Sequence, residues 1–139
     1  PLIAVMHPTH ALANRDSLSI KDLSGFPMIN FSPQANPITS DFNKQIFKKA
    51  GAQLNIVREI PNIETAAFCA SINEGVFIMP EYLLSSIGSL RTIPLTDSFA
   101  YVTLNLIWKK KNPNISIPVF VDSFSTYIQN RNPNLAPAD

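Results

Sequence analysis

Apolar residues in this chain form short runs that alternate with polar segments rich in proline and glycine. The clearest example begins at Asn62, a preferred helix N-cap residue, and continues as an apolar helix with small side chains that Gly75 is predicted to end. Residues 76–79 then form a continuous apolar run, typical of a strand buried on both faces, and Pro80 ends it. In open α/β sheets, ligands bind at helix N-termini and beyond the carboxyl ends of strands, which here means near Asn62 and Pro80.

The same alternation predicts the remaining elements. Ser19 and Asp22 match a capping box at the start of a short helix, Thr39 or Ser40 is predicted to cap a longer helix that Gly51 ends, and Ser116 is predicted to cap the last helix. The predicted strands cover residues 2–6, 27–31, 53–60, 76–79, 90–95 and 100–110, and the predicted helices cover residues 19–23, 39–50, 62–74, 81–87 and 116–129. Residues 130–139 are predicted to be a frayed tail. This order predicts an α/β fold with a mixed sheet.

The amino-acid composition excludes some classes of function. The 139 residues are 45% hydrophobic and 15% charged with a net charge of +1, so a broad nucleic-acid-binding surface is not expected. The basic run at residues 109–111 is interpreted as a solvated strand end. No stretch approaches the ~20 apolar residues of a membrane span, and the first residues do not resemble a signal peptide. The single cysteine fits a reducing compartment, so we expect a cytoplasmic protein without membrane contact.

The residues with reactive side chains do not form a convincing catalytic or metal site. Cys69 lies in the middle of an apolar helix without a histidine nearby in sequence, which favours a buried, inert thiol. His7 and His10 lie three residues apart in a turn that contains proline, without a cluster of other metal ligands. The glutamates are scattered, and four glycines leave little material for a phosphate-binding loop. We therefore predict no catalytic residue, no metal site and no cofactor.

Two helix starts that follow strands are candidates for binding a small anion or polar metabolite. The predicted starts at Thr39 and Asn62 would each leave backbone N–H groups for a carboxylate or phosphate. Ser32, Gln34 and Asn36 add short polar side chains around the first start. The alternative is that these residues only cap helices and form turns, and the local pattern alone favours that alternative.

Several motifs, in order, resemble the effector-binding domain of LysR-type transcriptional regulators. They are PLIAVMHPTHALA, SLSIKDLSGFPMINF, FKKAG, NIETAAFCASINEGVFIMPEYL and TLNLIWKKKNP, and the resemblance extends from residue 1 to about residue 129. It implies a periplasmic-binding-protein-like fold of type 2, of which this chain supplies the second subdomain at about residues 7–99. Residues 2–6 and 100–110 correspond to the crossover strands, and residues 116–129 to the C-terminal helix.

The resemblance also implies a function. The chain is expected to be the effector-sensing part of a bacterial regulator, with a small anionic or polar metabolite in the cleft between two subdomains. DNA contact is expected only through a winged-helix domain outside this chain, and the full-length protein is expected to be a homo-oligomer, either a dimer or a tetramer. The implied effector contacts are Ser32, Gln34, Asn36, Thr39, Asn62, Ile63 and Pro80. A lobe of a periplasmic solute-binding protein is the main alternative, and a lobe of a biosynthetic enzyme is a third.

Overall fold

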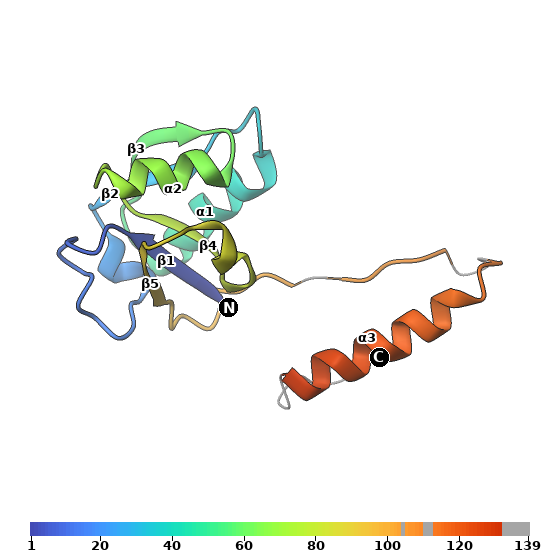
Figure 1. Ribbon diagram of the computed structural model, residues 1–139. Coiled ribbons are helices and arrows are strands. Elements are labelled where there is room, and N and C mark those ends of the chain that lie inside the picture. Colours follow the sequence, from blue (N-terminus) through green and yellow to red (C-terminus); the bar gives the residue numbers. More distant parts are fainter. Residues whose placement is uncertain (104, 110–112, 132–139) are drawn as a thin grey trace. The chain divides into compact units, whose positions relative to one another are not determined.

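The computed structural model describes residues 1–103, 105–109 and 113–131 (Figure 1). By its internal contacts the chain divides into two compact units, Pro1–Thr103 and Leu104–Asp139. Among the described helices, none is both long enough and apolar enough to cross a membrane.

The first unit is built on five strands. The strands are β1 (Leu2–Met6), β2 (Pro27–Phe31), β3 (Asn55–Ile60), β4 (Phe77–Pro80) and β5 (Arg91–Pro94). β1 lies between β4 and β5 and is antiparallel to both, whereas β2 and β3 pair in parallel. A parallel bridge between Met28 and Val76 links the two groups, with the Ile29 N–H donating to the Val76 carbonyl at 2.8 Å. The predicted mixed α/β sheet is therefore confirmed.

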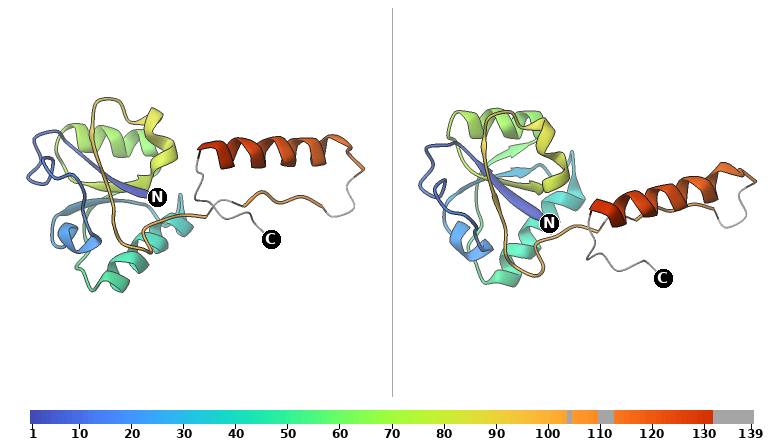
Figure 2. Two further views of the ribbon diagram at one scale, coloured as in Figure 1. Left: turned by 90° about the horizontal axis from the view of Figure 1, so that it is seen from below. Right: turned by 60° about the horizontal axis from the view of Figure 1, so that its bottom comes forward.

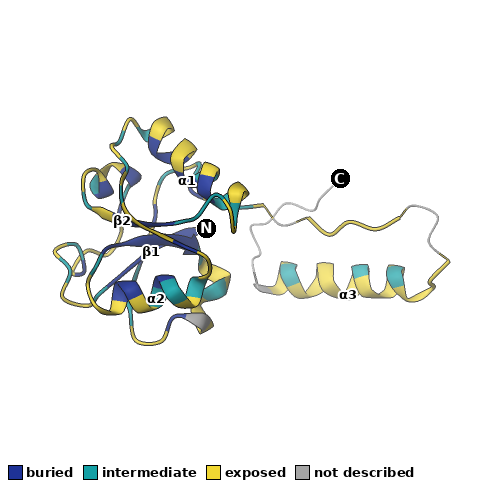
Figure 3. Cartoon of the chain, turned by 90° about the horizontal axis from the view of Figure 1, so that it is seen from above, coloured by how far each residue is buried: buried dark blue, intermediate teal, exposed yellow. Residues whose placement is uncertain are grey.

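Helices cover both faces of these strands, as the burial colouring shows (Figure 3). α1 (Pro37–Ala50) and the short 3-10 helix η1 (Ile20–Leu23) pack on one face, and α2 (Ile63–Ser71) packs on the other. Two further views show the same layers (Figure 2). β1 contributes to both cores, because Leu2, Ala4 and Met6 face the α1 side while Ile3 and Val5 face the α2 side. All five residues of β1 are buried, as a strand covered on both faces requires.

α1 begins earlier than predicted. Its N-cap is Asn36, whose side-chain oxygen accepts from the Thr39 N–H at 3.1 Å, so the prediction of Thr39 or Ser40 as the cap is wrong. Pro37 explains the difference, because proline suits the first helical position, where its fixed φ fits the helix and no N–H is needed. The end of α1 is as predicted: Gly51 takes the left-handed conformation with φ of 65°.

The end of α2 also differs from the prediction. Asn62 is the N-cap, as predicted, but the helix ends at Ser71 rather than near Gly75. Asn73 takes the left-handed conformation with φ of 59°, its N–H donates to the Ala70 carbonyl, and the Glu74 N–H donates to the Cys69 carbonyl. These two bonds form a Schellman motif, in which asparagine replaces the usual glycine.

The strand predicted at 100–110 is not formed in its described part. Residues 100–103 and 105–109 have no strand conformation, and the rest of the segment lies outside the described residues. The Leu2 N–H does donate to the Ala100 carbonyl at 2.9 Å. However, β1 already pairs with β4 on one edge and β5 on the other, so it offers no free edge to a third strand.

The remaining elements match the predictions closely. The capping box of Ser19 and Asp22 is present at η1, and a second 3-10 helix, η2 (Glu81–Ser86), precedes Gly88. In the second unit, α3 (Ser116–Arg131) begins at Ser116 itself, whose N–H donates to the Asn114 side chain at 2.9 Å. Asn114, not Ser116, therefore has the capping role. α3 extends past the predicted start of the tail, and residues 132–139 lie outside the described part of the chain.

Candidate functional site

A small cavity lies in the first unit, beside the carboxyl end of β4 and the first turns of α1. Its volume is about 150 Å³, and it is open to solvent on one side. β1 and β4 form one wall, since Leu2 is the register partner of Pro80. The lining residues are Leu2, Ile38, Thr39, Phe42, Asn43, Ile78, Met79, Pro80 and Val102. The cavity is therefore mainly apolar, and none of its lining residues is charged.

Two polar residues, Thr39 and Asn43, reach the cavity from α1. They are four residues apart, so they lie on the same face of the helix, one turn from each other. Thr39 is half-buried, and Asn43 is only 6% exposed. These two side chains supply the polar part of an otherwise apolar cavity.

A buried network of hydrogen bonds holds Asn43 in place. Its side-chain Nδ2 donates to Oδ1 of Asn30 on β2 at 2.8 Å. Asn30 in turn donates from Nδ2 to the Ser40 hydroxyl at 3.4 Å. Asn30 and Ser40 are 2% and 0% exposed, so this network crosses the interface between the sheet and α1 away from water. Buried polar groups of this kind require partners, and here each amide orients the next.

The structure brings two of the seven predicted contacts, Thr39 and Pro80, into the cavity wall. The Ser32 hydroxyl accepts from the Ala35 N–H, and the Asn36 side chain is used by the α1 cap. Asn62 accepts from the Thr65 N–H at 2.9 Å and from the Thr65 hydroxyl at 2.8 Å. The five predicted contacts outside the cavity wall are Ser32, Gln34, Asn36, Asn62 and Ile63. Their contact with a ligand stays a prediction.

These five residues nevertheless lie at the same edge of the sheet as the cavity. β2 and β3 are parallel and end side by side, with Phe31 as the register partner of Ile60. The Ser32 N–H donates to the Ile60 carbonyl at 2.8 Å, which ties the loop after β2 to the start of the α2 segment. The bridge between β2 and β4 is also parallel, so β4 ends at this edge too.

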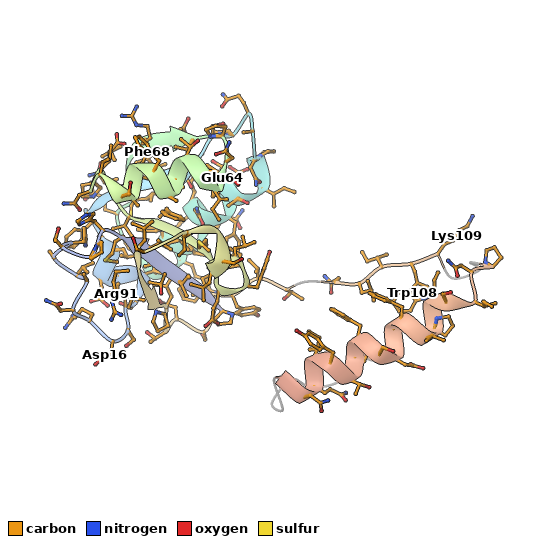
Figure 4. The ribbon with its side chains drawn as sticks, in the orientation of Figure 1. Asp16, Glu64, Phe68, Arg91, Trp108 and Lys109 are labelled. Carbon is orange, nitrogen blue, oxygen red and sulfur yellow. The ribbon has the colours of Figure 1, made fainter. Side chains whose placement is uncertain are left out.

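The start of α1 offers fewer free donors than the sequence predicts. Pro37 has no N–H, the Thr39 N–H is bound by Asn36, and the Ser40 N–H donates to the Asn36 carbonyl. At α2 the Thr65 N–H is bound in the same way, and Glu64 places a carboxylate in the first turn (Figure 4). A negative side chain there disfavours a second anion. Neither helix start is therefore a strong anion site by itself.

The groups whose pKa values are shifted are not among the residues that line the cavity. The Arg58 guanidinium on β3 binds the Glu74 carboxylate, with Nε 2.7 Å from Oε1, and this pair lowers the pKa of Glu74 and raises that of Arg58. Burial, with the neighbouring Glu74 carboxylate, raises the pKa of the Cys69 thiol, which is unfavourable for a nucleophile. Burial lowers the pKa of His10. Within the described residues, no group of three or more His, Cys, Asp or Glu side chains could hold a metal ion.

Sequence reasoning missed most of the cavity wall. The missed residues are Leu2, Ile38, Phe42, Asn43, Ile78, Met79 and Val102. Most are apolar and look like core residues in the sequence. Asn43 had a visible signal: it lies one turn before Phe47, on the face of α1 that packs on the sheet, where a polar residue is unusual.

Comparison with known proteins assigns the fold to a family. The model of the LysR substrate binding domain matches residues 1–127. The chain belongs to this family. It is 27% identical over 111 residues to the uncharacterized HTH-type transcriptional regulator YwbI of Bacillus subtilis (strain 168), a match covering 78% of this chain and 36% of that regulator.

Solved structures agree with this fold. The effector binding domain of BenM with its effector benzoate has a TM-score of 0.78 at 18% identity, covering 98% of this chain and 62% of that one. The effector binding domain of QuiR in complex with shikimate has a TM-score of 0.59 at 21% identity, covering 69% of this chain and 45% of that one. HinK, a LysR family transcriptional regulator from Pseudomonas aeruginosa, has a TM-score of 0.65 at 20% identity, covering 87% of this chain and 42% of that one. The chain therefore spans less than two thirds of each of these proteins.

Proposed function

We propose that this chain is the effector-sensing part of a bacterial LysR-type transcriptional regulator that acts in the cytoplasm. In this proposal, a small metabolite binds at the edge of the sheet beside β4 and α1 and changes DNA binding by a winged-helix domain elsewhere in the protein. The match of the family model to residues 1–127 carries the proposal. The BenM and QuiR effector binding domains, which have benzoate and shikimate as ligands, support a small organic effector.

In this proposal the cavity forms one wall of the effector site. Thr39 and Pro80 contact the effector there, and Ser32, Gln34, Asn36, Asn62 and Ile63 provide further contacts at the same edge. A ligand shifts the conformational equilibrium only by its difference in affinity between two states. We therefore propose that a second subdomain outside this chain closes over the same edge and completes the site.

A lobe of a periplasmic solute-binding protein, the main alternative from the sequence, has less support. The matched family and the curated relative described above are those of transcriptional regulators. The third alternative, an enzyme lobe, would need a set of acid and base residues around the cavity, and the lining contains no residue of either kind.

We also propose that the full-length protein is a homo-oligomer. Phe68 on α2 (Figure 4) and Ile72, the C-cap residue of that helix, are 63% and 59% exposed, although α2 covers one face of the sheet. Large apolar side chains exposed together favour a protein contact over contact with water. Light scattering of wild type against a Phe68→Glu, Ile72→Glu double variant tests this proposal, and an unchanged mass would contradict it.

The effector site is tested by blocking the cavity. Thr39→Trp places a large ring at the cavity wall without removing the Thr39 backbone N–H that Asn36 caps. Lys44→Trp is the matched control, because this exposed position lies on the same helix but not in the cavity wall. A library of small metabolites is screened for compounds that raise the melting temperature. We expect such compounds to stabilise wild type and Lys44→Trp but not Thr39→Trp, and equal stabilisation of all three would contradict the site.

A further inference from the structure

We propose that Asn43 selects effectors that carry a hydrogen-bond donor, a hydroxyl or an N–H group, on an apolar ring-sized body. The inference rests on the proposed function, because it concerns the ligand of the same cavity. It adds a residue and a ligand chemistry that neither the family match nor the related structures supply.

The Asn43 amide is held in one orientation. Its Nδ2 donates to the Asn30 oxygen at 2.8 Å, and Asn30 is itself held by Ser40. Because Asn30 and Ser40 are buried, water does not compete for these bonds. The amide is therefore fixed before a ligand arrives, which lowers the entropy cost of recognition.

The oxygen of that amide, Asn43 Oδ1, has unused hydrogen-bonding capacity. No described residue donates to Asn43 Oδ1, and the described residues include no fully enclosed side-chain oxygen or nitrogen without a partner. Asn43 Oδ1 is therefore not sealed in the core, although its side chain is only 6% exposed. Since Asn43 lines the cavity, we take Oδ1 as the acceptor that meets the ligand, and half-buried Thr39 lies one turn before it.

The walls of the cavity limit the charge that a ligand can carry. The other lining residues are apolar and none carries a charge. A carboxylate placed here would lose part of its hydration without a cation to replace it, and it would face the partial negative charge of the Asn43 oxygen. A neutral hydroxyl or N–H group meets that oxygen at low cost. A cavity of about 150 Å³ holds one benzene-sized ring.

Three probes of similar size test this inference on the wild-type chain. Phenol has a donor, anisole has only an acceptor, and benzoate is an anion. Each is titrated while the amide resonances of Phe42, Asn43 and Met79 are followed by NMR. We expect phenol to bind about fivefold more tightly than anisole, which corresponds to one net hydrogen bond, and benzoate to bind more weakly than both. Equal affinities for phenol and anisole, or a preference for benzoate, would overturn the inference.

Two variants test whether Asn43, rather than another residue of the proposed site, makes the selective contact. Asn43→Leu keeps a similar volume and should bring the ratio of phenol to anisole affinity close to one, with CD spectra checking that the variant folds. Thr39→Val should retain most of the preference for phenol, and a complete loss in Thr39→Val alone would move the selective contact to Thr39. If the probes perturb these resonances but phenol and anisole bind equally well, the cavity remains the proposed site and the role of Asn43 is wrong. If they perturb none of these resonances, the inference is wrong, because the cavity of this chain then takes no ring-sized ligand, whereas the effector site is judged by the Thr39→Trp comparison above.

Discussion

Gly75 lies against the carbonyl group of Pro27 so closely that no other residue fits there. A Cβ atom on Gly75 would be 2.7 Å from the Pro27 oxygen and 3.1 Å from its carbonyl carbon. The contact occurs where β2 and β4 approach each other, and the Val76 N–H donates to the same Pro27 oxygen at 2.9 Å. Gly75 therefore allows the two strand groups to join.

We predict that Gly75→Ala destabilises the fold by about 2–3 kcal/mol, because the obstructing atoms are backbone and cannot rotate away. Urea unfolding measures this change. Gly88→Ala is the control: it has a φ of 62° and open space around it, so it costs only backbone strain of about 1 kcal/mol. The variants also differ locally, since only Gly75→Ala should speed hydrogen exchange at the Ile29 and Val76 amides. Unchanged exchange at these two amides would contradict the role of Gly75.

Asn73 should tolerate glycine but not alanine. Its φ of 59° is in the left-handed region, where asparagine and glycine are accepted more readily than residues with other side chains. We expect Asn73→Ala to lower the free energy of unfolding by about 1 kcal/mol, and Asn73→Gly to change it by less than about 0.5 kcal/mol. Urea unfolding of the pair is the test, and equal losses would show that the side chain of Asn73, not its backbone conformation, is what matters.

These two residues show how far the sequence could predict the fold. Helix periodicity, capping residues and apolar runs located nearly all the elements of the first unit, because those signals are local. The sequence assigned the helix end to Gly75, since glycine is the usual residue there. In the structure Asn73 ends the helix, and Gly75 serves a contact with Pro27, 48 positions earlier in the chain, which no local pattern encodes.

The strand predicted at 100–110 is not formed among its described residues, 100–103 and 105–109, for a related reason. Alternation of apolar and polar residues indicates an extended chain, but a strand also needs a partner to pair with. β1, whose Leu2 N–H donates to the Ala100 carbonyl, already pairs with β4 and β5 on its two edges. Local sequence patterns also located only part of the candidate site. Thr39 and Pro80 could be identified from element ends, whereas Leu2, Asn43 and Val102 meet at the cavity only through the packing of β1, α1 and the segment after β5.

The capping box at η1 should make stability depend on acid pH. Asp22 accepts from the Ser19 N–H and from the Ser19 hydroxyl, each at 2.7 Å, and the backbone bond is the main cause of its lowered pKa. A lowered folded-state pKa means that the stabilisation is complete above the unfolded value of 3.8 and is lost as the pH falls through the folded value. The carboxylate is partly exposed, which reduces the effect.

We therefore expect Asp22→Asn to lower stability by at most about 1 kcal/mol at pH 7, with the difference from wild type shrinking below about pH 4. Urea midpoints at pH 7, 5, 4 and 3 measure it. Asp16→Asn removes the same charge from an exposed position and controls for net charge. A difference that stays constant down to pH 3 would rule out the ionised carboxylate as its source.

Cys69 should be almost unreactive in the folded protein. It is 6% exposed on the sheet-facing side of α2, and its raised pKa keeps little thiolate at neutral pH. We expect iodoacetamide to modify it roughly a hundredfold more slowly than the cysteine of a Cys69→Ala, Ser71→Cys variant, since position 71 is exposed on the same helix. In urea the two rates should converge. Fast modification of native Cys69 would instead mean that α2 separates readily from the sheet, because the thiol cannot react while its helix is packed.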